Sequence, residues 1–318
     1  EIGVRLVGSE MCIRDRFKEI PLLFSTNNGN RTATDTHPMR GLLINKPYET
    51  GVNDFLEKSI TLGIISPSQD ALRFYQFLEN QNLKIKKYND KDNYIIDYAG
   101  FFAIYGVSLS FPTPNDKEWE RINEPLIIGI KETAQQIKQL ICDSIVKISS
   151  TTRRKIIVIY IPQRWEPYTS YQLDGETFDL HDYIKAFCAE KGIMSQLIRE
   201  KTINDTIQKC QIHWWLSLSF FVKSFRTPWI LANTNNTTAF AGLGYSVENK
   251  KDINGHIVLG CSHIYSSNGE GLKYKLAKIS NDKIQWRHKK PHLCYDDAYE
   301  FGKSIVNLFY ESMNELPK

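Results

Sequence analysis

The stretch Ile156-Ile157-Val158-Ile159-Tyr160-Ile161 is the clearest signal for a buried strand in the sequence, and the basic run 153–155 comes directly before it. The stretch has no alternation between polar and apolar residues, which is typical of a strand that is covered on both sides. Strands of this kind occur in parallel sheets with helices on both faces. The stretch therefore predicts an α/β fold around it.

Strand and helix patterns alternate on either side of this run. Strands are expected at 59–66, 101–111 and 126–130, and helices at 69–82, 132–149, 180–191 and 214–225. Gly192 is a plausible C-terminal cap of the third of these helices. Strands that alternate with helices imply a largely parallel sheet, so residues 52–228 are predicted to form one Rossmann-like domain.

A second pattern follows Pro228. Strands are expected at 239–247, 256–265 and 272–279, followed by a helix at 298–315. Consecutive strands indicate a meander, so residues 229–318 are predicted to form a second domain. Because the chain stops soon after the helix, this domain is expected to be truncated at its C-terminus.

The N-terminal part of the chain has weaker patterns. Residues 1–16 show neither a helical nor a strand period and have no apolar core of the length that a secretory signal requires. They resemble translated sequencing-adapter sequence and are expected to lie outside the fold. Residues 17–51 are polar and turn-rich, with a short extended piece at 41–48, and are predicted to be linker-like.

Composition excludes some classes of protein. The 318 residues include 40 basic and 36 acidic side chains, for a net charge of +4. No run approaches the ~20 apolar residues of a membrane-spanning helix, which argues against a membrane protein. The six cysteines are scattered without a CxxC pair, which in a chain of this length indicates reduced thiols and a cytoplasmic protein.

Positive charge is concentrated in one segment. Residues 271–290 carry seven basic and one acidic side chain, with Tyr274 and Trp286 interleaved. This pattern is typical of contact with a nucleic-acid backbone, although a solvated hairpin has the same composition. The candidate contacts are Lys273, Lys275, Lys278, Arg287, Lys289 and Lys290.

Four polar residues have spacing that suggests a site for phosphate. His181 and Lys185 lie at i and i+4 of an expected helix, and Gln196 and Lys223 follow on later elements. Lysine supplies positive charge, while histidine and glutamine supply hydrogen-bond donors. The alternative for the His181 and Lys185 pair alone is an ordinary helix surface.

These four residues, followed by a new strand domain, resemble the MID domain of Argonaute and Piwi-type proteins. The early Gly41-Leu42-x(4)-Pro47-Tyr48 string and the basic strand 153–161 agree with that family, and the resemblance covers residues 40–318. It implies that His181, Lys185, Gln196 and Lys223 bind the 5′ phosphate of a guide strand. The histidine-lysine motif, with no recognisable PAZ-like module before residue 52, is similar to the short prokaryotic Argonautes.

The second domain then resembles the start of a PIWI domain, a fold similar to RNase H. In that family the first metal-binding carboxylate lies on the first strand, within a sequence that corresponds here to Ala241–Ser246. Gly244 occupies its position. A glycine has no side chain to ligate a cation, so the resemblance implies a protein that does not cut its target and is not itself an enzyme.

The resemblance also implies partners. They are a short guide, expected to be RNA, a complementary target, expected to be single-stranded DNA, and a separate APAZ-containing effector protein. The effector would be TIR-like, sirtuin-like or a nuclease, and the system would act in defence against phage or plasmids. Mg²⁺ at the guide 5′ phosphate is implied for the full-length protein, where the chain's C-terminal carboxylate helps to hold it.

Other interpretations stay open. An RNase H-like nuclease would use acids such as Glu248, Asp252, Asp296 or Asp297, and an interaction scaffold would bind no guide. His288-x3-His292-x-Cys294, with Cys261 and His263 nearby, has zinc-ligand residue types but also fits a basic loop. Gly242-x-Gly244 lacks the third glycine of a dinucleotide site. Trp214, Trp215, Phe220 and Phe221 are expected to belong to the core rather than to stack on bases.

Overall fold

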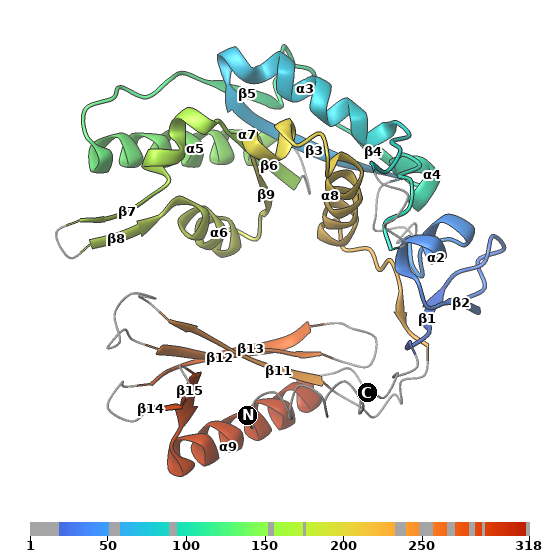
Figure 1. Cartoon of the computed structure of the whole chain (residues 1–318), viewed down its shortest axis with the longest axis vertical. Helices are drawn as coiled ribbons and strands as arrows, with labels where there is room; N and C mark the ends of the chain where they lie inside the picture. The colour runs from blue at the N-terminus through green and yellow to red at the C-terminus, as the bar shows by residue number, and fades with distance from the viewer. Residues whose placement is uncertain are drawn as a thin grey trace, which may run out of the picture. The chain divides into compact units, whose positions relative to one another are not determined.

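The computed structural model describes residues 19–50, 58–88, 94–151, 156–173, 176–232, 240–247, 257–265, 271–279, 284–287 and 290–315 (Figure 1). From residue 240 to 291 the description covers the backbone alone. The chain divides into two compact units, Glu1–Trp229 and Ile230–Lys318.

A five-stranded parallel sheet forms the centre of the first unit. Its strands are β3 (Ser59–Pro67), β4 (Ser108–Ser110), β5 (Trp119–Ile122), β6 (Ile156–Ile161) and β9 (Met194–Arg199). On one side, β3 pairs first with β4 and then with β5. On its other side it pairs with β6, which in turn pairs with β9, and all four pairings are parallel. The predicted α/β fold with a parallel sheet is confirmed.

Side chains of β6 alternate between two hydrophobic cores, because successive strand residues point to opposite faces. Ile156, Val158 and Tyr160 pack into one core with residues of α3 (Ala71–Glu79), α4 (Phe101–Tyr105) and α8 (Lys209–Lys223). The intervening residues of β6 pack into the other core with α5 (Ile130–Thr151) and α6 (Leu180–Glu190). Helices therefore cover both faces of the sheet, as the unbroken apolar run of β6 predicts (Figure 1).

The first unit has several smaller elements. They are β1 (Leu22–Phe24), β2 (Ala33–Asp35), α2 (Pro38–Ile44), η1 (Ser68–Asp70), η2 (Asn80–Asn82), η3 (Gln163–Tyr168), β7 (Ser170–Leu173), β8 (Glu176–Asp179) and α7 (Glu200–Asn204). β1 pairs with β2, and β7 with β8, both antiparallel. None of the helices within the described residues has an apolar stretch long enough to span a lipid bilayer.

The prediction that residues 17–51 are linker-like is wrong for the described part, 19–50. Phe24, Met39 and Leu42 are buried in the core that contains α8. The piece predicted to be extended at 41–48 begins inside helix α2 instead. Met39 and Leu42 lie three residues apart in the seven-residue helix α2, and Phe24 lies on the three-residue strand β1. Elements this short give too weak a pattern in the sequence to show that the segment belongs to the core.

Two further predicted elements are wrong. In the segment 101–111, residues Phe101–Tyr105 form helix α4, which ends at Gly106 with φ of +69°, and only Ser108–Ser110 is a strand. The segment 126–130 forms no strand, and its residues 126–128 are exposed. The strand in this region is β5, whose Trp119 is buried and donates from Nε1 to Ser66 Oγ at 2.9 Å. Short apolar runs cannot distinguish helix, strand and loop by periodicity alone.

The aromatic residues of α8 lie largely where the sequence predicts them. Trp214, Phe220 and Phe221 are buried, and all three belong to the core on the α8 face of the sheet. Trp215 differs, because 44% of its surface is exposed. A helix of 3.6 residues per turn cannot bury every neighbouring pair, so one member of the tryptophan pair points outward.

The second unit contains the expected meander. β11 (Phe240–Val247), β12 (Ile257–Tyr265) and β13 (Gly271–Ile279) form an antiparallel sheet in that order, and helix α9 (Tyr295–Glu315) follows. A short strand β10 (Ile230–Leu231) precedes them. The hairpin of β14 (Ile284–Arg287) and β15 (Lys290–Leu293) was not predicted.

Candidate functional site

Three elements of the first unit converge near the start of β9. Asp179 caps α6, because its Oδ1 accepts a hydrogen bond from the backbone N–H of Asp182 at 3.0 Å. After α6, Gly192 adopts a φ of +65°, a conformation that suits glycine at a helix end. The chain then enters β9, so that Lys185 of α6 lies beside Ser195, the second residue of the strand.

Two lysine side chains meet at Ser195. Lys185 Nζ donates to the carbonyl oxygen of Ser195 at 2.6 Å and to its Oγ at 3.2 Å. Lys223, the last residue of α8, donates from Nζ to the same carbonyl oxygen at 2.9 Å and also to Oε1 of Gln196. An ammonium group has three N–H bonds. Each lysine therefore uses two donors to hold its position and keeps a third for a ligand.

The two ammonium groups have no acidic partner in the part of the chain that the structure describes. Both side chains are half-buried. Burial lowers the pKa of Lys185. Burial, and secondarily the charge of Lys185, lower the pKa of Lys223 to about 8. Two like charges that share one acceptor are electrostatically unfavourable, and an anion between them would relieve the repulsion.

Gln196 is held by a residue that the sequence did not suggest. Ser219 Oγ donates to Gln196 Oε1 at 2.9 Å, and the amide nitrogen of Gln196 donates to the carbonyl of Leu197 at 3.0 Å. Ser219 precedes Lys223 by one helical turn, so both contact Gln196 from the same face of α8. The i, i+4 spacing of Ser219 and Lys223 was the only available signal in the sequence.

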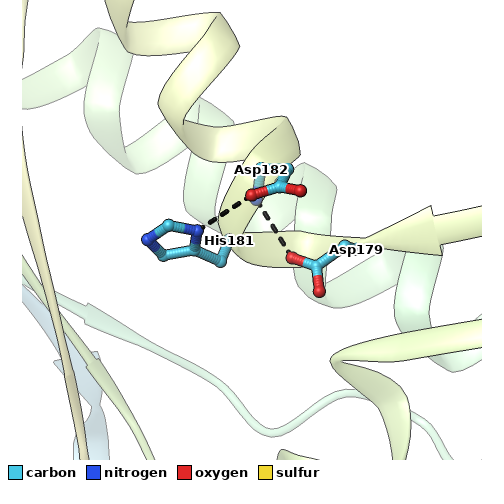
Figure 2. A group of neighbouring side chains, drawn as sticks. All are labelled: Asp179, His181 and Asp182. Carbon is cyan, nitrogen blue, oxygen red and sulfur yellow. Dashed lines mark hydrogen bonds and ion pairs between the residues drawn. The ribbon is translucent and has the colours of Figure 1, made fainter. Parts of the chain in front are cut away.

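Among the contacts of the described residues, none joins the His181 ring to Lys185, Gln196 or Lys223. Its side chain is 52% exposed, and its Nδ1 lies 3.1 Å from Oδ1 of Asp182, the next residue (Figure 2). The structure therefore brings together Lys185, Gln196 and Lys223, whereas His181 lies on the exposed first turn of α6. Its proposed part in phosphate binding stays a prediction.

A cluster that could accept a metal ion lies at the same helix end. Oxygen or nitrogen atoms of Asp179, His181 and Asp182 lie within 4.8 Å of one another (Figure 2). However, Asp179 is the helix cap, and the other two residues are exposed. Helix capping and a local contact between neighbours account for this arrangement without an ion.

The lysine pair itself does not fit the divalent cation that the family resemblance implies. The two oxygens nearest the ammonium groups, the Ser195 carbonyl and Gln196 Oε1, already accept hydrogen bonds from lysine. Mg²⁺ requires oxygen ligands that are free to coordinate it, usually including carboxylates. Lys185 and Lys223 carry positive charge, which repels a cation, so the lysine pair is suited to an anion and not to Mg²⁺.

The remaining candidate residues lie in the second unit. The backbone places positions 273, 275 and 278 on β13, 287 on β14 and 290 on β15, while Lys289 lies outside the described residues. Gly244 lies on β11, paired with Gly260 of β12. Nucleic-acid contact by the basic residues therefore stays a prediction.

The alternative metal and nuclease sites are only partly within the described residues. His288, Glu248 and Asp252 lie outside them, and the side chains of Cys261 and His263 are not described. His292 is exposed, and Cys294 Sγ donates to Asp297 Oδ2 at 3.2 Å. Cys294 thus contacts an acid of α9, and among the described residues no contact joins it to His292.

Comparison with known proteins reveals a similarity of fold. No model of a known protein family matches the chain, and no curated protein matches it in sequence. The crystal structure of Drosophila Piwi matches 95% of this chain with a TM-score of 0.53 and 11% identity. An Argonaute structure from Aquifex aeolicus matches 94% of the chain at 16% identity, with a TM-score of 0.45. A second Aquifex structure, with externally bound siRNA, matches 93% at 14% identity, with a TM-score of 0.44.

The chain spans about a third of the length of these proteins, namely 33% of Piwi and 34% and 35% of the two Aquifex chains. At these low identities the likeness concerns the fold alone. The mixed α/β architecture with its parallel sheet matches that of the MID and PIWI domains of Argonaute proteins.

Proposed function

We propose that this chain binds the phosphorylated 5′ end of a short guide strand, as the guide-binding subunit of a short prokaryotic Argonaute system. One observation carries the proposal, namely that Lys185 and Lys223 share the Ser195 carbonyl and have no acidic partner among the described residues. The likeness of fold to Piwi supports it.

The charge of the lysine pair favours a terminal phosphate over an internal one. A phosphate monoester carries a charge of about −1.5 to −2 at pH 7, which two ammonium groups neutralise. An internal phosphodiester carries a single negative charge shared by two non-bridging oxygens, whereas a monoester has three such oxygens and nearly twice the charge. The spare N–H of each lysine would donate to a separate phosphate oxygen, and charge-assisted hydrogen bonds of this kind contribute about 1.5–3 kcal/mol each.

Holding one end of the guide sets its register, and base pairing then recognises the target. We propose an RNA guide, a single-stranded DNA target and a separate APAZ-containing effector protein that responds to target binding. We further propose that the chain does not cut the target, because the family resemblance assigns Gly244 to the position of the first metal-binding carboxylate. Incubation of the guide-loaded chain with labelled target and Mg²⁺ or Mn²⁺ should therefore leave the target intact.

The proposal is tested by binding of a 5′-phosphorylated RNA to the full chain and to the double variant Lys185→Met, Lys223→Met. The double variant should lose most of the affinity, and inorganic phosphate should compete with the RNA on the wild type only. Lys201→Met removes an exposed lysine of α7 and serves as the control. Equal RNA affinity in the double variant and the control would exclude the lysine pair as the site.

A further inference from the structure

A polar cavity lies in the first unit, and its lining does not include Lys185, Gln196 or Lys223. It has a volume of about 310 Å³ and lies between the loop 25–31 and the segment 46–50. Its lining includes Thr26, Asn27, Arg31, Lys46, Tyr48 and Glu49. Pro47 and Tyr48 belong to the early sequence motif, and neither residue contributes to the proposed phosphate site.

The cavity combines positive charge with an aromatic face. The guanidinium carbon of Arg31 lies 4.6 Å from the centre of the Tyr48 ring, and Lys46 contributes a second basic side chain. Arg31 Nη2 is also 3.4 Å from Glu49 Oε1, with both side chains about half exposed. An exposed ion pair of this kind is weak, so a phosphate could replace the carboxylate.

Backbone hydrogen bonds hold the walls of the cavity. Ser25 and Lys46 exchange backbone hydrogen bonds of 3.0 and 2.9 Å, and Thr26 accepts one from Gly29 at 2.9 Å. Gly29 adopts a φ of +82°, which lets the loop turn back on itself. The basic and aromatic side chains are therefore displayed on a backbone that is already ordered.

Hydrogen bonds join the wall of the cavity at residues 49–50 to residues 226–227, which follow Lys223 in the chain. The backbones of Glu49 and Thr227 exchange hydrogen bonds of 3.0 and 3.2 Å, and Arg226 Nε donates to the carbonyl of Thr50 at 2.7 Å. Four residues of extended chain span at most ~14 Å, which bounds the separation of the Lys223 and Thr227 Cα atoms. A nucleic-acid strand held at Lys223 by one end could therefore reach the cavity within a few nucleotides.

We propose that this cavity is a second contact for single-stranded nucleic acid. Arg31 and Lys46 would neutralise backbone phosphate, and the Tyr48 ring would stack on a base, a combination that binds single strands without sequence preference. This inference rests on the proposed function, since it takes the strand held at the lysine pair as the ligand.

The test compares Arg31→Ala with Arg121→Ala, which removes an exposed arginine from β5. The probe is a 5′-phosphorylated RNA of about a dozen nucleotides, a typical length for single-strand sites. Arg31→Ala should reduce the slope of log affinity against log salt by about 0.7, the value for one contact on a single strand. Arg121→Ala should leave the slope unchanged. Equal effects of the two variants would overturn the proposal.

Two more variants examine the chemistry of the cavity. Glu49→Gln should strengthen binding up to about fivefold, because it removes the competitor for Arg31. Tyr48→Ala should weaken binding, and Tyr48→Phe should restore it, because phenylalanine keeps the stacking ring. A loss of affinity in Glu49→Gln, or no difference between the two Tyr48 variants, would contradict the assigned roles.

A dinucleotide probe separates failure of this inference from failure of the proposed function. The dinucleotide presents a 5′ phosphate to the lysine pair with the fewest further contacts, so it reports on the lysine pair with the least contribution from the cavity. If Arg31→Ala leaves binding of the longer strand unchanged while the 5′-phosphorylated dinucleotide still binds better than its 5′-hydroxyl form, only the second contact is wrong. If neither length shows a preference for the phosphate, the proposed function fails first.

Discussion

Lys185 and Lys223 point their ammonium groups at one atom, the carbonyl oxygen of Ser195, at distances of 2.6 and 2.9 Å. The two lysines belong to different helices, and both are half-buried. Placing like charges together in a partly desolvated position costs free energy, and no acid offsets that cost within the described residues. Such arrangements are typical of functional sites, where a ligand supplies the missing charge.

Replacement of Lys223 should weaken binding of RNA without lowering the thermal stability of the chain. Lys223→Met removes the group whose pKa is lowered by burial and by Lys185, so its thermal stability should stay unchanged or increase. Affinity for a 5′-phosphorylated RNA should fall by about 1.5–3 kcal/mol, the contribution of one charge-assisted hydrogen bond. Fluorescence anisotropy and thermal unfolding measure the two effects, with Lys201→Met as the control. A loss of stability with full affinity would identify Lys223 as structural.

The affinity for phosphate should rise with pH through about pH 6 and fall again above about pH 8. The second ionisation of a phosphate monoester has a pKa of about 6, so affinity should rise as the pH increases through that value. Lys223 has a pKa of about 8 in the folded chain without ligand, so affinity should fall as the pH increases above about 8. The alkaline decrease should be weaker in Lys223→Met. Titration calorimetry from pH 5 to pH 10 tests this, and a decrease of equal size in both proteins would assign it to another group.

The same group affects folding stability without ligand. The pKa of Lys223 is lowered from 10.5 to about 8, so between these pH values the unfolded chain binds more protons than the folded chain. The free energy of unfolding should therefore increase as the pH rises from 8 to 10.5, so the folded chain becomes more stable. Denaturant unfolding at these two pH values should show a larger gain in the wild type than in Lys223→Met, which keeps the lowered pKa of Lys185.

Ser219 should act through the orientation of Gln196. Ser219→Ala removes the hydrogen bond to Gln196 Oε1 while leaving both lysines in place. The loss of one neutral hydrogen bond corresponds to about 0.5–1.5 kcal/mol, so the preference for a 5′ phosphate should decrease several-fold. Ser219→Thr keeps the hydroxyl and should restore the preference. If alanine and threonine variants have the same preference, Gln196 does not need Ser219.

His213 should make the first unit sensitive to acid. The ring is fully buried and packs against Phe77 and Tyr98, and among the described residues neither ring nitrogen has a hydrogen-bond partner. Burial, with a smaller effect of Lys209, lowers the pKa of His213 to about 4 from 6.5. The unfolded chain then takes up its proton first, so stability should fall as the pH decreases from 6.5 to 4.

The substitution His213→Phe tests this dependence. It keeps an aromatic ring against Phe77 and Tyr98 and removes two unpaired buried nitrogens, each of which costs about 1–3 kcal/mol. Denaturant unfolding should show a more stable protein near pH 7 and a smaller loss between pH 6.5 and pH 4. An unchanged acid dependence would show that other groups control it.

The sequence predicts those parts of the fold that have long, regular patterns. The unbroken run of β6 and the helical period of α5 reflect burial that involves many residues, so both elements could be located. The segment 19–50 could not, because its place in the core depends on contacts among Phe24, Met39 and Leu42. Strand β5 was missed for a similar reason, since its position depends on the distant pairing with β3.

The candidate site could also be predicted only in part: the sequence indicates its side chains but not the backbone atom that they share. Lysine and glutamine can be picked out because their chemistry suits phosphate, and the structure brings Lys185, Gln196 and Lys223 together. The atom at the centre of the arrangement is a backbone carbonyl, which any residue at position 195 would supply. The contact of His181 with Asp182 depends on side-chain orientation, which spacing along a helix does not determine.

The most direct measurement compares the affinity of the full chain for one short RNA that carries either a 5′ phosphate or a 5′ hydroxyl. The phosphate form should bind at least about tenfold more tightly, since a single charge-assisted hydrogen bond already contributes ~1.5 kcal/mol. This difference should disappear in the Lys185→Met, Lys223→Met variant. Equal affinity of the wild type for the two forms would contradict the assignment of the lysine pair as a pocket for the guide 5′ phosphate.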